Sequence, residues 1–322
     1  MKTLALALAA AAVLLLAGVS LFVGATDLSP AALFASGPDG TALQLLLISR
    51  IPRTVALILS GMAMGVCGMI MQMLVRNRFV EPSTAGTVES AGLGILTVTL
   101  LAPTMPLLGK MTVAALFALA GTALFLGILS RIPLRSALMV PLVGLMLGGV
   151  IDSVTTFFAY RYDLLQSLNA WTTGDFSGVL RGRYELLWIA FALTILAYAA
   201  ADRFTVAGMG RDFTTNLGLN YRRIMALGLG IVAMVTAAVV VTVGIIPFLG
   251  LIVPNLVSMM VGDNVRRAVP WVAVTGAGAV LACDLIGRVV RYPYEIPVGT
   301  VVGVLGSAVF LYLLLRRDSS LA

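Results

Sequence analysis

The first residues in this sequence that could do chemistry are ionisable side chains inside apolar runs. Asp152 lies in the apolar run 136–160, on one helical face with Gly148, Thr155 and Thr156. A charge within a membrane span is costly and so indicates function, and a stripe of glycine and hydroxyl neighbours is typical of a hydrated lining. A carboxylate that is hydrogen-bonded to a neighbouring helix fits the same pattern. The sequence leaves both interpretations open.

A second ionisable pair lies near the C-terminal end of the chain, where Asp284 precedes Arg288 by one helical turn. A carboxylate four residues before a guanidinium is the favourable order for an ion pair on a helix. We therefore interpret these two residues first as a structural ion pair.

Several kinds of chemistry are excluded by residue types. The chain has no histidine, which removes the commonest general base and the commonest transition-metal ligand. Cys67 and Cys283 lie far apart in apolar runs and form no CxxC motif. Neither Lys2 nor Lys110 completes a G-x-x-x-x-G-K-[ST] phosphate loop. The sequence predicts no catalytic residue, no metal site and no cofactor in this chain.

The composition is that of an all-α polytopic membrane protein. Of 322 residues, 60% are hydrophobic and only 11% are charged, against roughly 45–50% and about 25% in soluble domains. Apolar runs long enough to cross a bilayer predict one transmembrane domain, 1–322, with about ten helices. The predicted spans are 4–24, 54–75, 86–103, 111–130, 136–160, 185–201, 224–243, 250–262, 270–287 and 298–315. The first run also resembles a signal peptide, and that alternative stays open.

The distribution of basic residues sets the predicted orientation. With both termini inside, 13 of the 21 lysines and arginines fall on the inner side and 8 on the outer side, which favours the N-in, C-in arrangement. The largest outer segments are then 25–53 and 161–184, and the largest inner segment is 202–223. So little chain outside the bilayer excludes nucleic acid as a partner.

The inner segment 202–223 differs from a simple turn. Thr214, Thr215 and Asn216 lie between a helix-like stretch and Gly218, a pattern that predicts two short helices with a bend. A structured amphipathic segment is something that a soluble partner can grip. A plain connecting loop in the membrane interface is the alternative.

Motifs along nearly the whole chain resemble the FecCD-type permeases, the membrane subunits of ABC importers for iron-siderophores, haem and vitamin B12. The motifs are Arg50-Ile51-Pro52-Arg53, Gly61 through Gln72, Arg76-Asn77-Arg78-Phe79-Val80-Glu81-Pro82, Trp171-Thr172-Thr173-Gly174, Asn216-Leu217-Gly218, Gly244 through Pro254 (GIIPFLGLIVP), Gly262-Asp263, Asp284 with Arg288, and Glu295-Ile296-Pro297-Val298-Gly299.

The resemblance implies a BtuC-like type II ABC importer fold in the inner (plasma) membrane of a bacterium, surrounded by membrane lipids. It implies four kinds of partner: a second permease subunit, identical or paralogous; two ATPase subunits, which would hold ATP and Mg²⁺; a periplasmic or lipid-anchored binding protein; and the ferric siderophore. Haem or vitamin B12 is the alternative cargo within this family. An ion-coupled secondary transporter with Asp152 and Asp284 as carriers is a second class of function, which the absence of broken-helix signals in matched halves of the sequence disfavours.

The resemblance also assigns roles to residues. It implies that the outer arginines Arg50, Arg53 and Arg288 meet acidic residues of the binding protein. It places the coupling segment 209–223 against the ATPase, with Arg211, Thr214, Thr215, Asn216 and Gly218 as the contact residues. It implies that the fifth span lines the translocation pathway with Gly148, Asp152, Thr155 and Thr156.

Two departures from the family pattern concern substrate and pairing. Most members read R-N-P-L-A-x-P where this chain has Arg78, Phe79 and Val80, and most read P-H-x-x-R where it has Pro254 followed by 255–258 (NLVS). The chain is therefore similar to a sub-branch, the permeases for catecholate-type siderophores that work with a different second permease.

Overall fold

The computed structural model describes residues 2–24, 41–132 and 139–318, and its regular structure in these ranges is helical throughout. Residues 25–40 of the predicted outer segment 25–53, and the start of the predicted span 136–160, lie outside the described residues. The helices are α1 (Lys2–Phe22), α3 (Thr41–Leu45), the π-helix η1 (Leu46–Arg50), α4 (Ile51–Val75), the 3-10 turn η2 (Ser83–Ala85), α5 (Thr87–Leu101), α6 (Leu107–Leu129), α7 (Met139–Arg161), α8 (Leu165–Thr172), α9 (Leu187–Ala199), α10 (Ala201–Gly208), α11 (Arg211–Asn216), α12 (Tyr221–Val243), α13 (Leu249–Val261), α14 (Val265–Val289) and α15 (Val298–Asp318).

Each predicted span falls on a helix, but the count of ten membrane crossings is not confirmed. Six helices of the described part are long and apolar enough to cross a bilayer, and α9 with α10 makes a seventh candidate that is bent by 64°. The apolar helices α5, α13 and Val298–Leu313 of α15 are shorter. At 1.5 Å per residue, α5 reaches only about 22 Å of a roughly 30 Å hydrocarbon core. Length alone therefore does not make these helices spans.

Helix α4 forms the centre of the bundle, and glycines let its neighbours come close. In the continuous helical stretch Ala42–Val75, 83% of the residues in its apolar part are buried, against 6% in α1 at the periphery. A Cβ at Gly61 would lie 2.5 Å from the carbonyl oxygen of Gly276 on α14, and one at Gly68 would lie 1.9 Å from that of Gly250 on α13. Only glycine permits these approaches, which bring the helix backbones close together.

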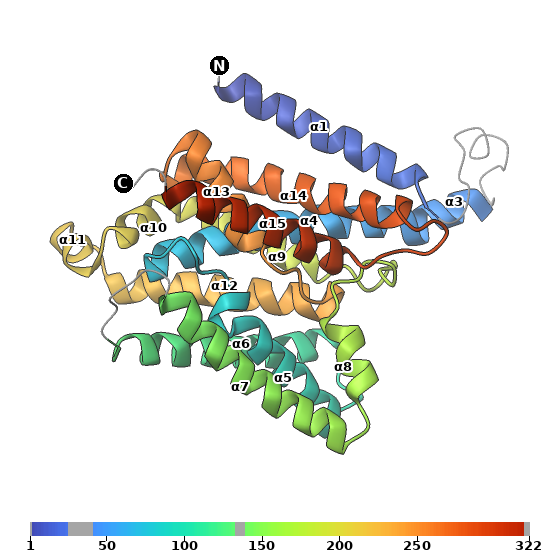
Figure 1. The fold of residues 1–322 in the computed structure, drawn as a ribbon, viewed down its shortest axis with the longest axis horizontal. Helices are drawn as coiled ribbons and strands as arrows, with labels where there is room; N and C mark the ends of the chain where they lie inside the picture. Colours follow the sequence, from blue (N-terminus) through green and yellow to red (C-terminus); the bar gives the residue numbers. More distant parts are fainter. Residues whose placement is uncertain (1, 25–40, 133–138, 319–322) are drawn as a thin grey trace.

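The helices divide into two groups on either side of α12 (Figure 1). Helices α1, α4, α13, α14 and α15 lie on one side, and α5, α6, α7 and α8 lie on the other. Contacts between α6 and α12 and between α4 and α12 join the two groups. The start of α1, the end of α15 and the short helix α11 lie at one end of the bundle, as the predicted topology requires (Figure 1). Helices α3 and α8 lie at the other end, which we call the outer end.

The chain is interrupted between α12 and α13, within the predicted GIIPFLGLIVP motif. Gly244 and Phe248 both have positive φ, at 85° and 61°. Glu81, from the loop between α4 and η2, accepts a hydrogen bond from the Phe248 amide at 2.9 Å and one from the Ser83 hydroxyl at 2.5 Å. A carboxylate at the start of a helix compensates its unpaired amides. Glu81 therefore fixes the start of α13 from a distant part of the chain.

Candidate functional site

A cavity of about 610 Å³ opens beside α7, and all four predicted pathway residues line it. These are Gly148, Asp152, Thr155 and Thr156. Asp152 is exposed, and its carboxylate makes no hydrogen bond or ion pair within the part of the chain that the structure describes. No neighbouring helix in the described part therefore offers Asp152 a hydrogen-bond partner. Its position in the cavity supports the interpretation that Asp152 lines a hydrated pathway.

Glu89 is a second carboxylate of this cavity, and our reading of the sequence missed it. It lies in the first turn of α5, inside the predicted span 86–103, so the rule that singled out Asp152 could have found it. Its Oε2 atom is buried without a hydrogen-bond partner among the described residues. A Cβ at Gly148 would lie 3.3 Å from the Glu89 Cδ atom, so the predicted glycine makes room for this side chain. Glu89 and Asp152 thus line the same cavity.

Part of the cavity wall is built where helices end or begin: at the end of α8, between α12 and α13, and at the start of α15. Ile245 donates to the carbonyl of Thr172 at 3.2 Å, and Gly299 donates to that of Gly174 at 2.7 Å. Three interrupted segments thus meet beside hydroxyl groups of Thr172, Thr173 and Thr300, which also line the cavity. Irregular backbone at membrane depth is tolerated where it lies inside protein or lines a polar cavity.

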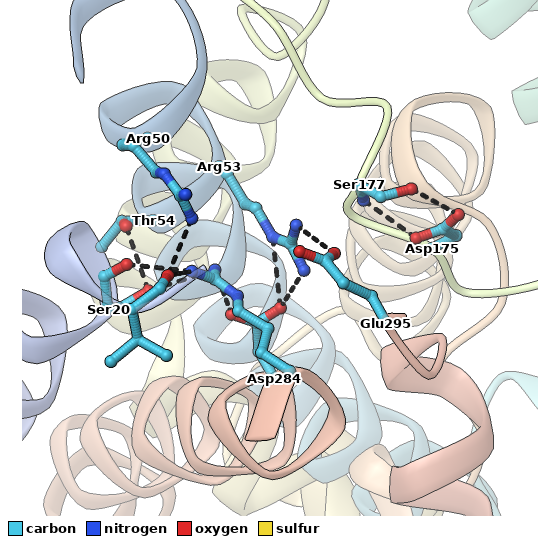
Figure 2. A network of polar contacts seen from close by, with 10 residues as sticks. Ser20, Arg50, Arg53, Thr54, Asp175, Ser177, Asp284 and Glu295 are labelled. Atoms are coloured by element: carbon cyan, nitrogen blue, oxygen red, sulfur yellow. Dashed lines mark hydrogen bonds and ion pairs between the residues drawn. The ribbon is translucent and has the colours of Figure 1, made fainter. Parts of the chain in front are cut away.

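The predicted outer arginines are brought together, but in a buried network (Figure 2). Arg53 joins two carboxylates: Nε and Nη2 donate to Asp284 Oδ1 at 3.2 and 2.7 Å, and Nη1 donates to Glu295 at 2.6 Å. Arg288 pairs with the other oxygen of Asp284, which confirms the predicted i,i+4 ion pair. The exposed fractions of Arg50, Arg53 and Arg288 are 7%, 7% and 3%.

The same network fixes the end of α1. Arg288 donates to the carbonyl oxygens of Ser20 and Val23 at 2.9 and 2.7 Å, and Arg50 donates to that of Val23 at 2.7 Å. The carbonyls of the last helical turn have no partner within the helix, and cations near them are stabilising. These arginines therefore have a structural role within the chain, and their predicted role in docking remains a prediction.

The inner segment 202–223 folds as the two short helices that the sequence predicts, α10 and α11, with a bend at Gly210, whose φ is 114°. The coupling segment 209–223 within it holds α11 and the start of α12. Thr214 is fully buried and donates to the Gly210 carbonyl at 2.6 Å. Arg211, Thr215 and Gly218 line a shallow groove of about 390 Å³ together with the start of α12. Asn216 is exposed on α11 but does not line this groove.

Comparison with known proteins supports the resemblance to the FecCD-type permeases. The model of the FecCD transport family matches residues 11–316. The petrobactin import system permease protein YclN of Bacillus subtilis is 49% identical over 306 residues, which cover 95% of this chain and 96% of that protein. The ferric-anguibactin transport system permease protein FatD of Vibrio anguillarum is 43% identical, covering 84% of this chain and 86% of that protein.

A solved structure of an inward-facing ABC transporter of the metal-chelate type superposes with a TM-score of 0.79. It covers 97% of this chain and 98% of that chain at 23% identity, which confirms the predicted fold. Apolar helices and permease relatives together identify a multi-pass bacterial membrane protein. The family match over nearly the whole chain and the identity of 49% show that the chain belongs to the FecCD transport family.

Proposed function

We propose that this chain is the permease subunit of an ATP-driven importer that moves a ferric, catecholate-type siderophore across the bacterial inner membrane. The observation that carries the proposal is a cavity of about 610 Å³, lined by two carboxylates and several threonines, within a chain of this family. The two relatives described above are named for petrobactin import and ferric-anguibactin transport, both siderophores of the catecholate type.

The cavity beside α7 is one wall of the pathway, and a second permease subunit completes it. Val150 and Phe157 of α7 are each 63% exposed, so the helix has a large apolar face that lipid or another subunit must cover. An identical copy or a paralogue packed near this face would enclose the carboxylates and threonines in a central passage. Such a passage binds cargo weakly, because affinity resides in the binding protein.

The coupling segment transmits ATP hydrolysis through an apolar stripe. Met209, Phe213 and Leu217 are spaced four residues apart and are 56%, 47% and 56% exposed. Met209 precedes the bend at Gly210, Phe213 lies on α11 and Leu217 follows its last residue. Exposed large apolar side chains of this kind mark an interaction site. The ATPase subunit, which holds ATP and Mg²⁺, covers this stripe. The permease chain itself hydrolyses no ATP.

At the outer end, the arginine network meets the binding protein. Glu295 is its most exposed acidic member, with 23% of the side chain accessible, whereas Asp284 is buried. A carboxylate of the partner that displaces Glu295 from Arg53 would keep the guanidinium paired throughout. In this arrangement docking exchanges one charge-assisted hydrogen bond for another.

Uptake of radioactive iron by cells that lack their own permease tests the proposal. We expect uptake of ferric petrobactin or ferric anguibactin that requires this chain, an intact ATPase and its binding protein. Uptake of haem or vitamin B12 in place of both siderophores would identify the other cargo of the family and contradict the siderophore assignment.

An ion-coupled transporter is the second candidate, and one observation favours it. Glu89 and Asp152 face one cavity beside interrupted backbone at Gly174 and Ile245, an arrangement that secondary transporters use to hold ions. Uptake that survives inactivation of the ATPase but stops when the proton gradient is dissipated would identify this mechanism. ATP-dependent uptake without a gradient would exclude it.

A further inference from the structure

A second cavity, of about 750 Å³, lies at the outer end of the bundle and shares no lining residue with the pathway cavity beside α7. Its walls come from the last turns of α5 and α12, the first turn of α6, the end of α8 and the loop segment 175–183. We call it the lateral cavity. Its volume lies within the range of roughly 300–1,000 Å³ that is usual for small-molecule sites in proteins.

Three side chains that can donate hydrogen bonds line the lateral cavity: Lys110, Trp171 and Arg183. Within the part of the chain that the structure describes, none of the three side chains makes a hydrogen bond or an ion pair. Asp175 also lines the cavity, but its carboxylate already accepts hydrogen bonds from the amide and hydroxyl of Ser177 at 2.9 and 2.7 Å (Figure 2). Two cations and an indole N–H without acceptors at one site indicate an anionic ligand.

The deeper wall of the lateral cavity is apolar. Ile95 of α5 and Val240 of α12 are buried there. The hydroxyl groups of Thr99 and Thr242 donate to carbonyl oxygens four residues earlier in their own helices, at 2.7 and 2.6 Å. Ile95 lies about 9 Å along α5 from the end of the helix at Leu101. The cavity thus combines a cationic outer rim with an apolar interior.

The border of the lateral cavity at α5 and α6 is also apolar. Leu101 and Leu108 are 82% and 55% exposed, and Leu107, which lines the cavity, is 36% exposed. Exposed apolar side chains at the ends of membrane helices mark contact with the bilayer. Trp171 belongs to the residue types that are enriched at headgroup level. The lateral cavity therefore lies beside the bilayer, at the depth of the outer headgroups.

We propose that the lateral cavity binds an anionic phospholipid of the outer leaflet. The lipid phosphate accepts hydrogen bonds from Lys110, Trp171 and Arg183, and the start of an acyl chain covers Ile95 and Val240. A soluble anion would use the donors alone and leave the apolar wall uncovered. A zwitterionic lipid would bring a cation of its own against the ammonium and guanidinium groups. This inference does not depend on the cargo of the transporter.

A thin wall of paired backbone separates the lateral cavity from the pathway cavity. Thr173 and Ile245 form a parallel bridge, and the amide of Asp175 donates to the carbonyl of Val243 at 2.9 Å. Thr173 and Ile245 line the pathway cavity, whereas Asp175 and Val243 line the lateral cavity. A lipid in the lateral cavity therefore packs against the segments that bound the translocation pathway.

The test measures lipid binding to the full transporter, which is delipidated in detergent, titrated with phosphatidylglycerol and analysed by native mass spectrometry. We expect Lys110→Gln with Arg183→Gln to raise Kd for phosphatidylglycerol at least about tenfold, because two charges near the headgroup are lost. Thr99→Phe, which places a ring in the apolar part of the cavity without changing its charge, should raise Kd by a similar factor. Arg161→Gln removes an exposed outer cation that does not line the cavity, and it should change Kd less than about twofold.

Phosphatidylcholine tests the role of the headgroup charge. It should bind the wild-type transporter at least about tenfold more weakly than phosphatidylglycerol and should not respond to the double substitution. Equal affinity for the two lipids would overturn the anionic headgroup.

Glycerol 3-phosphate and inorganic phosphate separate a lipid from a soluble anion. Neither should displace phosphatidylglycerol at a large molar excess, and displacement by either would assign the donors to a soluble anion and overturn the lipid. Wild-type affinity in the double variant would place the bound lipid outside the lateral cavity. The double variant decides alone should Thr99→Phe fail to fold, because the Lys110 and Arg183 side chains have no hydrogen-bond or ion-pair partner among the described residues.

Discussion

Arg53 and Asp284, which are 231 residues apart in sequence, are joined by two hydrogen bonds that converge on a single carboxylate oxygen. The Nε–Oδ1 and Nη2–Oδ1 distances are 3.2 and 2.7 Å, and Asp284 is only 1% exposed. This pair connects α4 with α14, and Arg288 takes the second oxygen of the same carboxylate. The single negative charge of the buried Asp284 is thus shared between two buried arginines.

Asp284→Asn should destabilise the protein strongly, because it leaves Arg53 and Arg288 buried with too little negative charge. Removing one partner of a buried ion pair typically costs about 3–5 kcal/mol. Thermal unfolding of the detergent-purified protein measures the effect. Asp263→Asn is the matched control, because it breaks the pair between Arg78 and Asp263, in which both side chains are about half exposed. Equal shifts in the two variants would show that the Asp284 network adds nothing to stability.

Glu295→Gln should strengthen docking of the binding protein if Arg53 meets a partner carboxylate. The substitution weakens the in-chain competitor for Nη1 of Arg53 and leaves the bonds to Asp284 in place. We expect a lower Kd at low salt, and a higher Kd in Arg53→Lys, because ammonium cannot copy the bidentate fork. Asp163→Asn, a charge change elsewhere at the outer end, serves as the control. Unchanged affinity in both test variants would restrict Arg53 to its structural role.

Local spacing explains what the sequence could predict. The Asp284–Arg288 pair and the α7 face with Gly148, Asp152 and Thr155 both follow from helical periodicity, which depends only on nearby residues. All ten apolar runs also fall on helices. The number of crossings could not be read in this way, because α5 and α13 are buried partly by neighbouring helices and need not span the bilayer alone.

Long-range packing explains what the sequence could not predict. The contacts of Arg53 with Glu295 and of Arg288 with Ser20 join segments that lie 242 and 268 residues apart. No periodicity links such positions, so the resemblance suggested outer arginines that point to a partner, whereas the structure pairs them inside the chain. Glu89 is different, since an acidic residue within a predicted span is a signal that was present in the sequence.

Glu81 should make stability depend on pH. This residue lies in the loop between α4 and η2, outside the spans, and burial raises its pKa to about 7 despite hydrogen bonds from Ser83 and from the backbone of Phe248. The ordinary pKa is 4.5, so the folded state holds a proton that the unfolded state loses between these values. Stability should therefore fall as pH rises from about 4.5 to about 7, and stay level above that.

Glu81→Gln removes this titration and should flatten the dependence. Thermal unfolding of the wild type and the variant between the two pKa values measures the difference, which we expect to grow with pH in favour of the variant. Glu185→Gln, at an exposed position, is the control. Parallel curves for Glu81→Gln and the wild type would mean that Glu81 does not change protonation on folding.

Cysteine labelling should show which face of α7 meets water. In a background without Cys67 and Cys283, Asp152→Cys and Thr156→Cys should react with a membrane-impermeant thiol reagent in at least one nucleotide state, because both positions line the cavity. Val154→Cys on the same helix is 41% exposed but outside the cavity lining, and it should react slowly. Protection of both cavity positions in every state would contradict a water-filled pathway at α7.

Gly218 provides the sharpest test of the coupling segment. Its backbone conformation favours glycine, whereas the space around it would admit a side chain. Its φ is 76°, and a Cβ there would have no neighbour within 4 Å. A β-branched residue with positive φ is strongly disfavoured, whereas asparagine tolerates this conformation. Gly218→Val should therefore distort the turn after α11 and abolish uptake, while Gly218→Asn should keep most of it. Membrane insertion and docking of the binding protein should remain normal in both, since these depend on other segments. Normal uptake by Gly218→Val at normal expression would remove the segment from the mechanism.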